Sequence, residues 1–227
     1  MASHDPSHHS AQPVAGSAPS ERTRIRRIAD NARYDRATLH AIVDAAYVCH
    51  VAFADDKGTH CIPTACWREG DHLYIHGSNG GRLIKLLAKG TQACVTITHV
   101  DGLVLARSAF HHSMNYRSAV VYGCFEAVTD KAAALDAFMH HLAPGREHEA
   151  RPGNSKELAA TTVMRISLAE AACKVRTGGP NDDVEDLQLP VWAGVLPLTM
   201  TRGAPVPDGL HIQPAPAYVR GWDGLAV

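Results

Sequence analysis

The stretch DHLYIHGSNGGRLIKLLAKG, residues 71–90, decides the fold that the sequence predicts. Apolar and polar side chains alternate over residues 72–76, which is the period of a β-strand. Glycines within residues 77–81 then break the alternation. The apolar residues 83, 84, 86 and 87 follow helical spacing, and Lys89 and Gly90 are ordinary signals for the end of a helix. We therefore expect a strand, a tight loop and a short helix.

The junction between this strand and this helix has the chemistry of an anion site. The first turn of a helix leaves backbone N–H groups unpaired, and glycines let a ligand approach the backbone. Arg82 adds a fork of donors suited to a phosphate, and Lys85 lies one turn further on the same face. The alternative is a plain turn in which Ser78 or Asn79 caps the helix. The glycine spacing matches neither a dinucleotide fingerprint nor a P-loop.

Composition restricts the class of protein. The chain has 227 residues, which suits one large domain or two small ones. A formal charge of −1 and the lack of a basic stripe argue against a nucleic-acid partner, and no apolar run is long enough to span a bilayer. Six cysteines occur without a CxxC pair or an export signal. We therefore expect all six to be reduced and structural, in a cytoplasmic protein.

The chain is expected to have one folded domain with a segment on each side. Residues 1–23 are rich in Ser, Pro, His and Ala and predict a disordered leader, with the basic cluster 22–27 as a solvated arm. Residues 24–203 form the predicted domain, and residues 204–227 form a Pro-rich extended tail.

Periodicity within the domain predicts mainly strands. Helices are expected at residues 35–46, 130–142 and 154–160. Strands are expected at residues 47–54, 59–68, 91–99, 103–109, 116–128, 163–168 and 171–176, the last two as a pair. Asp101-Gly102 is typical of a hairpin turn. The prediction is one antiparallel β-barrel with a few helices packed outside it.

Five stretches in the same order resemble a known family. They are AYVCHVAF (46–53), HCIPTACWREGDHLYIHGS (60–78), DGLVLARSAFHHSMNYRSAVVYG (101–123), AACKVRTG (171–178) and LPVWAGVLPL (189–198). Together they resemble the FMN-binding split β-barrel of the pyridoxamine 5′-phosphate oxidase-like superfamily, in the branch of flavin-nucleotide-binding proteins that includes nitroimidazole-resistance proteins. The resemblance covers roughly residues 24–210.

The resemblance implies an FMN site shared by two subunits of a homodimer. The strand residues whose backbone would line the isoalloxazine ring are Cys61, Ile62, Pro63 and Thr64. Those that would approach the ring edge and the ribityl chain are His76, Gly77 and Ser78, and those that would hold the phosphate are Arg82 and Lys85. The partner subunit would contribute Asn115, Tyr116, Arg117 and Ser118, and Trp192 matches a tryptophan near the ring.

In such a site the flavin carries the chemistry and no side chain need be a catalyst. His76 is the one candidate for a catalytic side chain. Either His76 or Arg117 could donate a hydrogen bond near N1 and the C2 oxygen of the flavin ring.

Two departures from the family argue against oxidation of pyridoxamine phosphate. Cys66 stands where the vitamin oxidases have a lysine for the substrate phosphate, and residues 195–198 replace an Arg-x-His substrate pair. The leading hypothesis is an FMN-dependent oxidoreductase that reduces a small acceptor such as a nitro compound, a quinone or oxygen.

The alternative hypothesis is a flavin- or haem-binding protein without turnover, acting in storage, sensing or stress response, because related split barrels hold haem or a deazaflavin. His111 or His112 could then be an axial haem ligand. We expect no bound metal ion at this pair, because adjacent histidines on an extended chain face apart and lack a third ligand.

Overall fold

The computed structural model describes residues 16–210, 213–222 and 224–225. The strands are β1 (Ala32–Arg33), β2 (Val48–Asp55), β3 (Gly58–Glu69), β4 (His72–Ser78), β5 (Gln92–Leu105), β6 (Ser113–Cys124), β7 (Glu126–Ala127), β8 (Thr161–Ser167), β9 (Ala171–Arg176) and β10 (Gly194–Pro197). The α-helices are α1 (Arg36–Asp44), α2 (Arg82–Leu87), α3 (Lys131–Leu142), α4 (Ser155–Ala160) and α5 (Ala217–Arg220). Short 3₁₀ turns are η1 (Ala29–Asn31), η2 (Ala109–His111), η3 (Arg146–His148) and η4 (Val184–Gln188).

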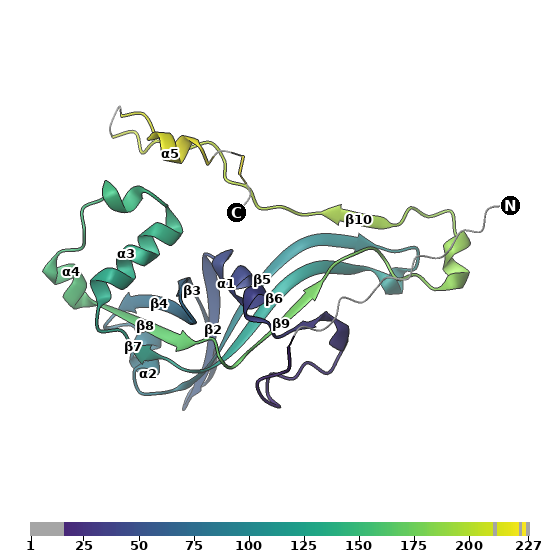
Figure 1. Ribbon diagram of the computed structural model, residues 1–227, viewed down its shortest axis with the longest axis horizontal. Coiled ribbons are helices and arrows are strands. Elements are labelled where there is room, and N and C mark those ends of the chain that lie inside the picture. The colour runs from purple at the N-terminus through teal and green to yellow at the C-terminus, as the bar shows by residue number, and fades with distance from the viewer. Residues whose placement is uncertain (1–15, 211–212, 223, 226–227) are drawn as a thin grey trace.

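All strand pairs are antiparallel. The sheet order is β1–β9–β6–β5–β2–β3–β4–β8–β7, and β10 pairs with the second half of β5. The sheet curls into a half-barrel with helices at its margins, and β5, β6, β9 and β10 extend from it as a long arm (Figure 1). The predicted split-barrel class with flanking helices is confirmed.

The main core lies on the inner face of the sheet. Asp35 caps α1 by accepting a hydrogen bond from the Thr38 N–H at 2.8 Å. Leu39, Ile42 and Val43 of this helix belong to one buried cluster with Val51 of β2 and Val95 of β5. A smaller cluster under α3 contains Trp67, Tyr74, Ala134 and Val163. The main cluster also includes Val95 of β5, Val121 of β6 and Cys173 of β9, so these strands belong to the core at one end and extend beyond it at the other.

Tertiary pairing overrides three local predictions. Asp101-Gly102 is no hairpin turn, because β5 runs through it with only a register shift, and Gly102 pairs with Asn115 on one side and Pro197 on the other. The long strand predicted at residues 116–128 breaks between β6 and β7. The two strands predicted as a pair at residues 163–176 lie apart, since β8 pairs with β4 and β7 while β9 pairs with β6 and β1.

The segment before the first strand lies against the sheet over its described part. Thr23 is buried, Ser20 donates a hydrogen bond to Glu170, and the Arg22 guanidinium lies 4.5 Å from the centre of the Tyr122 ring. Arg22, Arg24 and Arg26 are all exposed. Arg22 contacts the Tyr122 ring, whereas Arg24 and Arg26 are ion-paired with Glu21.

The six cysteines, expected to be reduced and structural, differ in burial. Cys49, Cys66 and Cys173 are buried, whereas Cys61 and Cys124 are exposed. All six are free thiols. Among the described residues no helix has the length and apolar character needed to cross a membrane.

Candidate functional site

The first half of β3 has one open edge. Residues from Gly58 to Ala65 pair with β2 on one edge of β3. On the other edge, β4 pairs with β3 only at residues Cys66 to Glu69, and β8 pairs with the other edge of β4. The Cys66 N–H donates to the Tyr47 carbonyl on the β2 side. Because backbone groups alternate along a strand, the N–H and carbonyl groups of Cys61 and the carbonyl of Pro63 point to the open edge. No strand of the described chain satisfies them.

Side chains of the predicted cofactor strand divide between the two faces of the sheet. Cys61 and Pro63 are exposed on the outer face. Ile62 packs against the main core, and Thr64 on the same side is half-buried. Cys61 and Pro63 therefore offer more side-chain surface to a ligand than Ile62 and Thr64 do, while the open edge offers backbone groups.

The turn before α2 is built without a side-chain cap. Gly81 is the N-cap and makes no side-chain capping bond, so the alternative that Ser78 or Asn79 caps the helix is wrong. The Ser78 carbonyl accepts from the Gly81 N–H at 2.8 Å, and Asn79 instead donates to the Ala159 carbonyl. A Cβ at Gly77 would lie 2.9 Å from Ile84, so packing of α2 on β4 requires this glycine.

Arg82 is held by an internal ion pair. Its guanidinium lies 2.7 Å from the Asp55 carboxylate, and His60 Nε2 lies within hydrogen-bonding reach of both. The Arg82 guanidinium and His60 hold the pKa of Asp55 well below its usual range. The Arg82 side chain is still 48% exposed, so donors remain for a ligand. Lys85 is exposed and has no ion pair with a described residue.

The His76 side chain faces α3. Its ring lies 4.8 Å from Phe138 and 5.9 Å from Trp67, centre to centre. Burial lowers the pKa of His76, so the ring is neutral near pH 7. Its Nδ1 is buried with no hydrogen-bond partner among the described residues. The ring therefore belongs to the aromatic cluster under α3, and only its backbone lies at the loop before α2.

The residues predicted to come from a partner lie on the arm. Asn115 is buried and donates to the Gly178 carbonyl at 3.1 Å. Arg117 makes a two-pronged ion pair with Asp101, at 2.9 and 2.8 Å. Tyr116 and Ser118 are half-buried on the same strand, β6. Trp192 is 67% exposed, and its ring lies close over Gly194.

Within one chain these residues form two separate groups. The Arg82 side chain contacts His60 of β3. His60 pairs with Phe53 of β2, and Phe53 pairs with Ala93, so Arg82 lies near the start of β5. Trp192 lies beside Gly194, which pairs with Leu105 at the other end of β5. The 14 residues of β5 span about 40 Å at the usual rise of a strand. One chain therefore does not bring Arg82 and Trp192 into one site.

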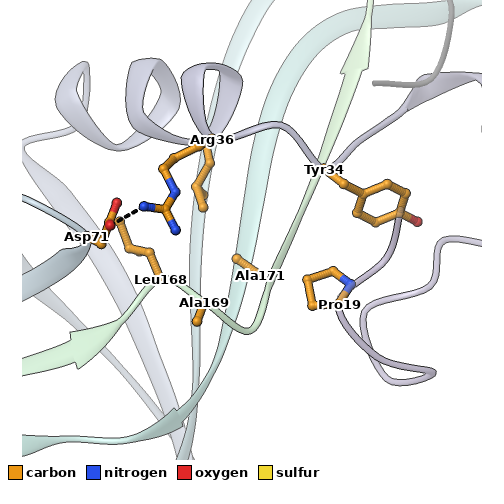
Figure 2. A pocket seen from close by; sticks show the side chains of 8 residues that line it. Pro19, Tyr34, Arg36, Asp71, Leu168, Ala169 and Ala171 are labelled. Atoms are coloured by element: carbon orange, nitrogen blue, oxygen red, sulfur yellow. Dashed lines mark hydrogen bonds and ion pairs between the residues drawn. The ribbon is translucent and has the colours of Figure 1, made fainter. Parts of the chain in front are cut away.

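Neither of two pockets in the described chain is a complete cofactor cavity. Figure 2 shows side chains that line a pocket, among them Pro19, Tyr34 and Leu168, with the Arg36–Asp71 ion pair at one side. The volume of this pocket is about 100 Å³. It contains none of the predicted site residues and is smaller than ligand pockets usually are. A second pocket of about 250 Å³ lies where β2, β3 and β5 begin or end, and His60 is in its wall.

His111 and His112 differ in exposure and in hydrogen-bond partners. His111 Nε2 lies 3.7 Å from Asp183, and its Nδ1 is buried without a partner among the described residues. His112 is exposed, and its Nδ1 lies 3.0 Å from the Ser108 carbonyl. Since a carbonyl only accepts, Nδ1 of His112 carries a proton and donates it to this hydrogen bond. The described residues contain no cluster of three or more side chains suited to a metal ion.

Comparison with known proteins identifies the family of this chain. The fold is that of a split-barrel protein, and one edge of β3 is left open from Gly58 to Ala65. Residues 35–175 match the family model described as pyridoxamine 5′-phosphate oxidase, and the chain belongs to this family. No curated protein matches the sequence.

Two solved structures are similar over nearly the whole chain. The flavocytochrome Anf3 of Azotobacter vinelandii is 42% identical with a TM-score of 0.86, over 91% of this chain and 99% of Anf3. An FAD- and haem-binding protein of Mycobacterium smegmatis is 38% identical with a TM-score of 0.81, over 86% of this chain and 98% of its own.

A third structure supports the fold alone. A candidate 5-nitroimidazole antibiotic resistance protein of Bacteroides thetaiotaomicron is 24% identical with a TM-score of 0.54, over 63% of this chain and 86% of its own.

Sequence reasoning missed the groups around Arg82. Asp55 and His60 flank a turn 22 to 27 residues before Arg82, and Arg22 lines the second pocket with His60. The Asp55-Asp56-Lys57-Gly58 run signals only a turn. Nothing in the local pattern connects it with the helix.

Proposed function

We propose that the protein binds a flavin nucleotide between two copies of the chain and works as an oxidoreductase. The observation that carries the proposal is the open edge of β3 beside Arg82. This edge offers unpaired backbone donors and acceptors to the polar rim of a flat ring, and the exposed part of the guanidinium offers donors to its phosphate. Sequence identities of 42% and 38% with a flavocytochrome and with an FAD- and haem-binding protein support it.

The homodimer is part of this proposal. Arg82 and Trp192 lie about 40 Å apart along β5 within one chain, so a common site requires the arm of a second chain. The arm is suited to such contact because Leu196, Leu103 and Met114 face one another across β10, β5 and β6 and are 52%, 38% and 47% exposed. Exposed apolar patches of this kind mark interaction surfaces.

A bound flavin would supply hydride or single-electron transfer between a donor and a small acceptor such as a nitro compound or a quinone. The chain's own part is to bind and orient the ring. We infer no role in pyridoxamine phosphate oxidation, because Cys66 is fully buried and no substrate lysine stands there. Six free thiols agree with a cytoplasmic location, which is included in the proposal.

Arg82→Ala tests the phosphate anchor. Hydrogen bonds to a charged group are worth roughly 1.5–3 kcal/mol, so flavin affinity should fall about 10- to 100-fold. The measurement is quenching of flavin fluorescence on titration with the protein from which flavin has been removed. Lys89→Ala, an exposed change at the other end of α2, should leave the affinity unchanged. A wild-type protein that takes up no flavin contradicts the whole proposal, and an unchanged Arg82→Ala variant contradicts the anchor.

Haem is a second ligand that a specific observation favours. The Nδ1–H of His112 donates to the Ser108 carbonyl, which leaves Nε2 free in the orientation that histidine ligands usually have. Phe110, two residues before it, is 91% exposed, and Met114 is also exposed, so the neighbourhood is apolar. We infer that His112, rather than His111, is the axial ligand of a haem at the tip of the arm.

His112→Ala should remove the Soret absorption of haem-loaded protein or shift it to that of a form without this ligand. Added imidazole should restore the original spectrum, because it replaces the lost Nε2 ligand. The matched control is His111→Ala, which should keep the wild-type spectrum. Loss of the Soret band in His111→Ala with retention in His112→Ala would reverse the assignment.

A further inference from the structure

Arg176, the last residue of β9, is a cation without a carboxylate partner. β9 lies beside β6 in the arm, where Arg176 is paired with Tyr116 in the register of the two strands (Figure 1). Arg117 of β6 is neutralised by Asp101, but no Asp or Glu of the described chain lies within ion-pairing distance of Arg176. An arginine keeps its proton in proteins, so this half-buried position has a positive charge that its surroundings do not balance.

Neutral acceptors hold one side of the Arg176 guanidinium. Nη1 donates to Asn115 Oδ1 at 2.5 Å and lies 3.4 Å from the Gly178 carbonyl, and Nη2 donates to the Gly179 carbonyl at 3.0 Å. Asn115 is itself buried and donates to the Gly178 carbonyl at 3.1 Å. These contacts fix the guanidinium before any ligand arrives, which lowers the entropy cost of binding one.

The other side of this guanidinium is open. Nε of Arg176 makes no hydrogen bond with a described residue and is not one of the polar atoms that are buried without a partner, so it reaches solvent. Nη2 has a second N–H next to it. The same two nitrogens bind a carboxylate side-on at two other places, in the pairs Arg68–Asp44 and Arg117–Asp101. The open side of Arg176 therefore fits the two oxygens of a carboxylate.

The position of Arg176 connects it with the proposed flavin site. Its guanidinium binds Asn115, and its strand neighbour is Tyr116, two of the residues predicted to meet the flavin of the partner subunit. Tyr116 is half-buried, so part of its side chain is open next to Arg176. A carboxylate on the open side of Arg176 would lie next to such a flavin, where a substrate has to bind.

We propose that Arg176 binds the carboxylate of the small acceptor that the flavin reduces, so that this substrate is an organic acid. The inference rests on the proposed function, because the flavin must lie between the two subunits. A carboxylate is assigned rather than a phosphate because one guanidinium balances the single charge of a carboxylate, whereas a phosphate monoester has a charge near −2. Neutral nitro compounds and quinones should bind less tightly than acids of the same shape.

Benzoate and benzamide test the assignment on flavin-loaded protein, because they share a ring and differ in charge. Titration calorimetry should show that benzoate binds at least about tenfold more tightly, since the amide lacks the charge-assisted hydrogen bonds. Benzoate should also shift the visible absorption of the bound flavin. Arg176→Lys should weaken benzoate about tenfold and leave the flavin affinity unchanged. Lysine keeps the charge and can still donate to the Gly178 and Gly179 carbonyls, but it has no side-on fork.

The matched control is Lys174→Gln. Lys174 lies two residues earlier on β9, is also half-buried, and donates to the Arg27 carbonyl, so this variant removes a cation and leaves the fork intact. It should bind benzoate like the wild type. If it weakens benzoate as much as Arg176→Lys does, binding depends on charge alone and the side-on site is wrong. Circular dichroism should show that both variants are folded.

The remaining outcomes separate this inference from the proposed function. Equal binding of benzoate and benzamide, or benzoate binding without a change in the flavin spectrum, overturns the inference. Phenyl phosphate that binds more tightly than benzoate overturns the assignment to a carboxylate, and a lower flavin affinity of Arg176→Lys makes Arg176 a flavin contact instead. Wild-type protein that takes up no flavin refutes the proposed function and this inference with it, whereas flavin-loaded protein that does not bind benzoate refutes the inference alone.

Discussion

Leu103→Asp is expected to convert the protein from a dimer into a monomer and to abolish flavin binding. Leu103 is the middle of the apolar ladder Leu196–Leu103–Met114 on the arm. A carboxylate there would be buried without a partner in the interface, at a cost of several kcal/mol, and two-fold symmetry introduces it twice. Light scattering should give 24.4 kDa, the mass of one chain, instead of twice that mass.

The control for this prediction is Leu142→Asp. Leu142 ends α3 and is 45% exposed, against 38% for Leu103, so the chemical change and the exposure are closely matched. This variant should remain a flavin-loaded dimer. If the Leu103→Asp variant remains a dimer and still binds flavin, the arm is not the subunit contact. The proposal that Arg82 of one chain and Trp192 of the partner chain form one site is then wrong.

Trp67→Ala is expected to destabilise the fold by about 3–5 kcal/mol. Trp67 is fully buried, and its ring lies 4.9 Å from Phe138 of α3 and 5.6 Å from Tyr74 of β4. Truncation would leave a cavity between the sheet and α3 that the rigid strand pairs cannot close. The midpoint of chemical denaturation should fall with little change in slope.

Trp67→Phe provides the comparison for the loss of this ring. Phenylalanine keeps part of the aromatic contact and removes the indole N–H, which has no hydrogen-bond partner among the described residues. Its cost should therefore be clearly smaller than that of Trp67→Ala. Equal stability of Trp67→Ala and the wild type would mean that α3 does not depend on this cluster.

Most helix starts and strands were predictable because their signals are local. Asp35, Asp130 and Asn154 cap α1, α3 and α4, each by accepting hydrogen bonds from backbone N–H groups within its own first turn. Alternation of apolar residues predicted β4, and β-branched and aromatic residues with the turn at residues 55–58 predicted β2 and β3, each to within a few residues. These helix caps and strand patterns depend on residues only a few positions apart, so they can be predicted from the sequence alone.

The wrong prediction at Asp101-Gly102 has the opposite cause. The dipeptide favours a tight turn, but β6 and β10 flank β5 at this point and continue its ladder on both edges. The free energy gained from strand pairing and packing on both edges of β5 outweighs the local preference of this dipeptide for a turn. As a result the chain forms a long arm where the sequence predicts two short strands, and the arm is the part proposed to meet a second subunit.

Local sequence was enough to predict an antiparallel barrel with flanking helices, and a strand, a tight loop and a short helix over residues 71–90, because residue period and glycine placement act over one or two turns of chain. The split-barrel class and the flavin site came from the family resemblance instead. Tertiary structure alone decided three other features. It paired Arg82 with Asp55 and His60, turned the His76 ring under α3, and separated Arg82 from Trp192 by the length of β5. Each of these depends on which distant segments meet, and hydrogen-bond pairing and burial across the whole sheet determine that.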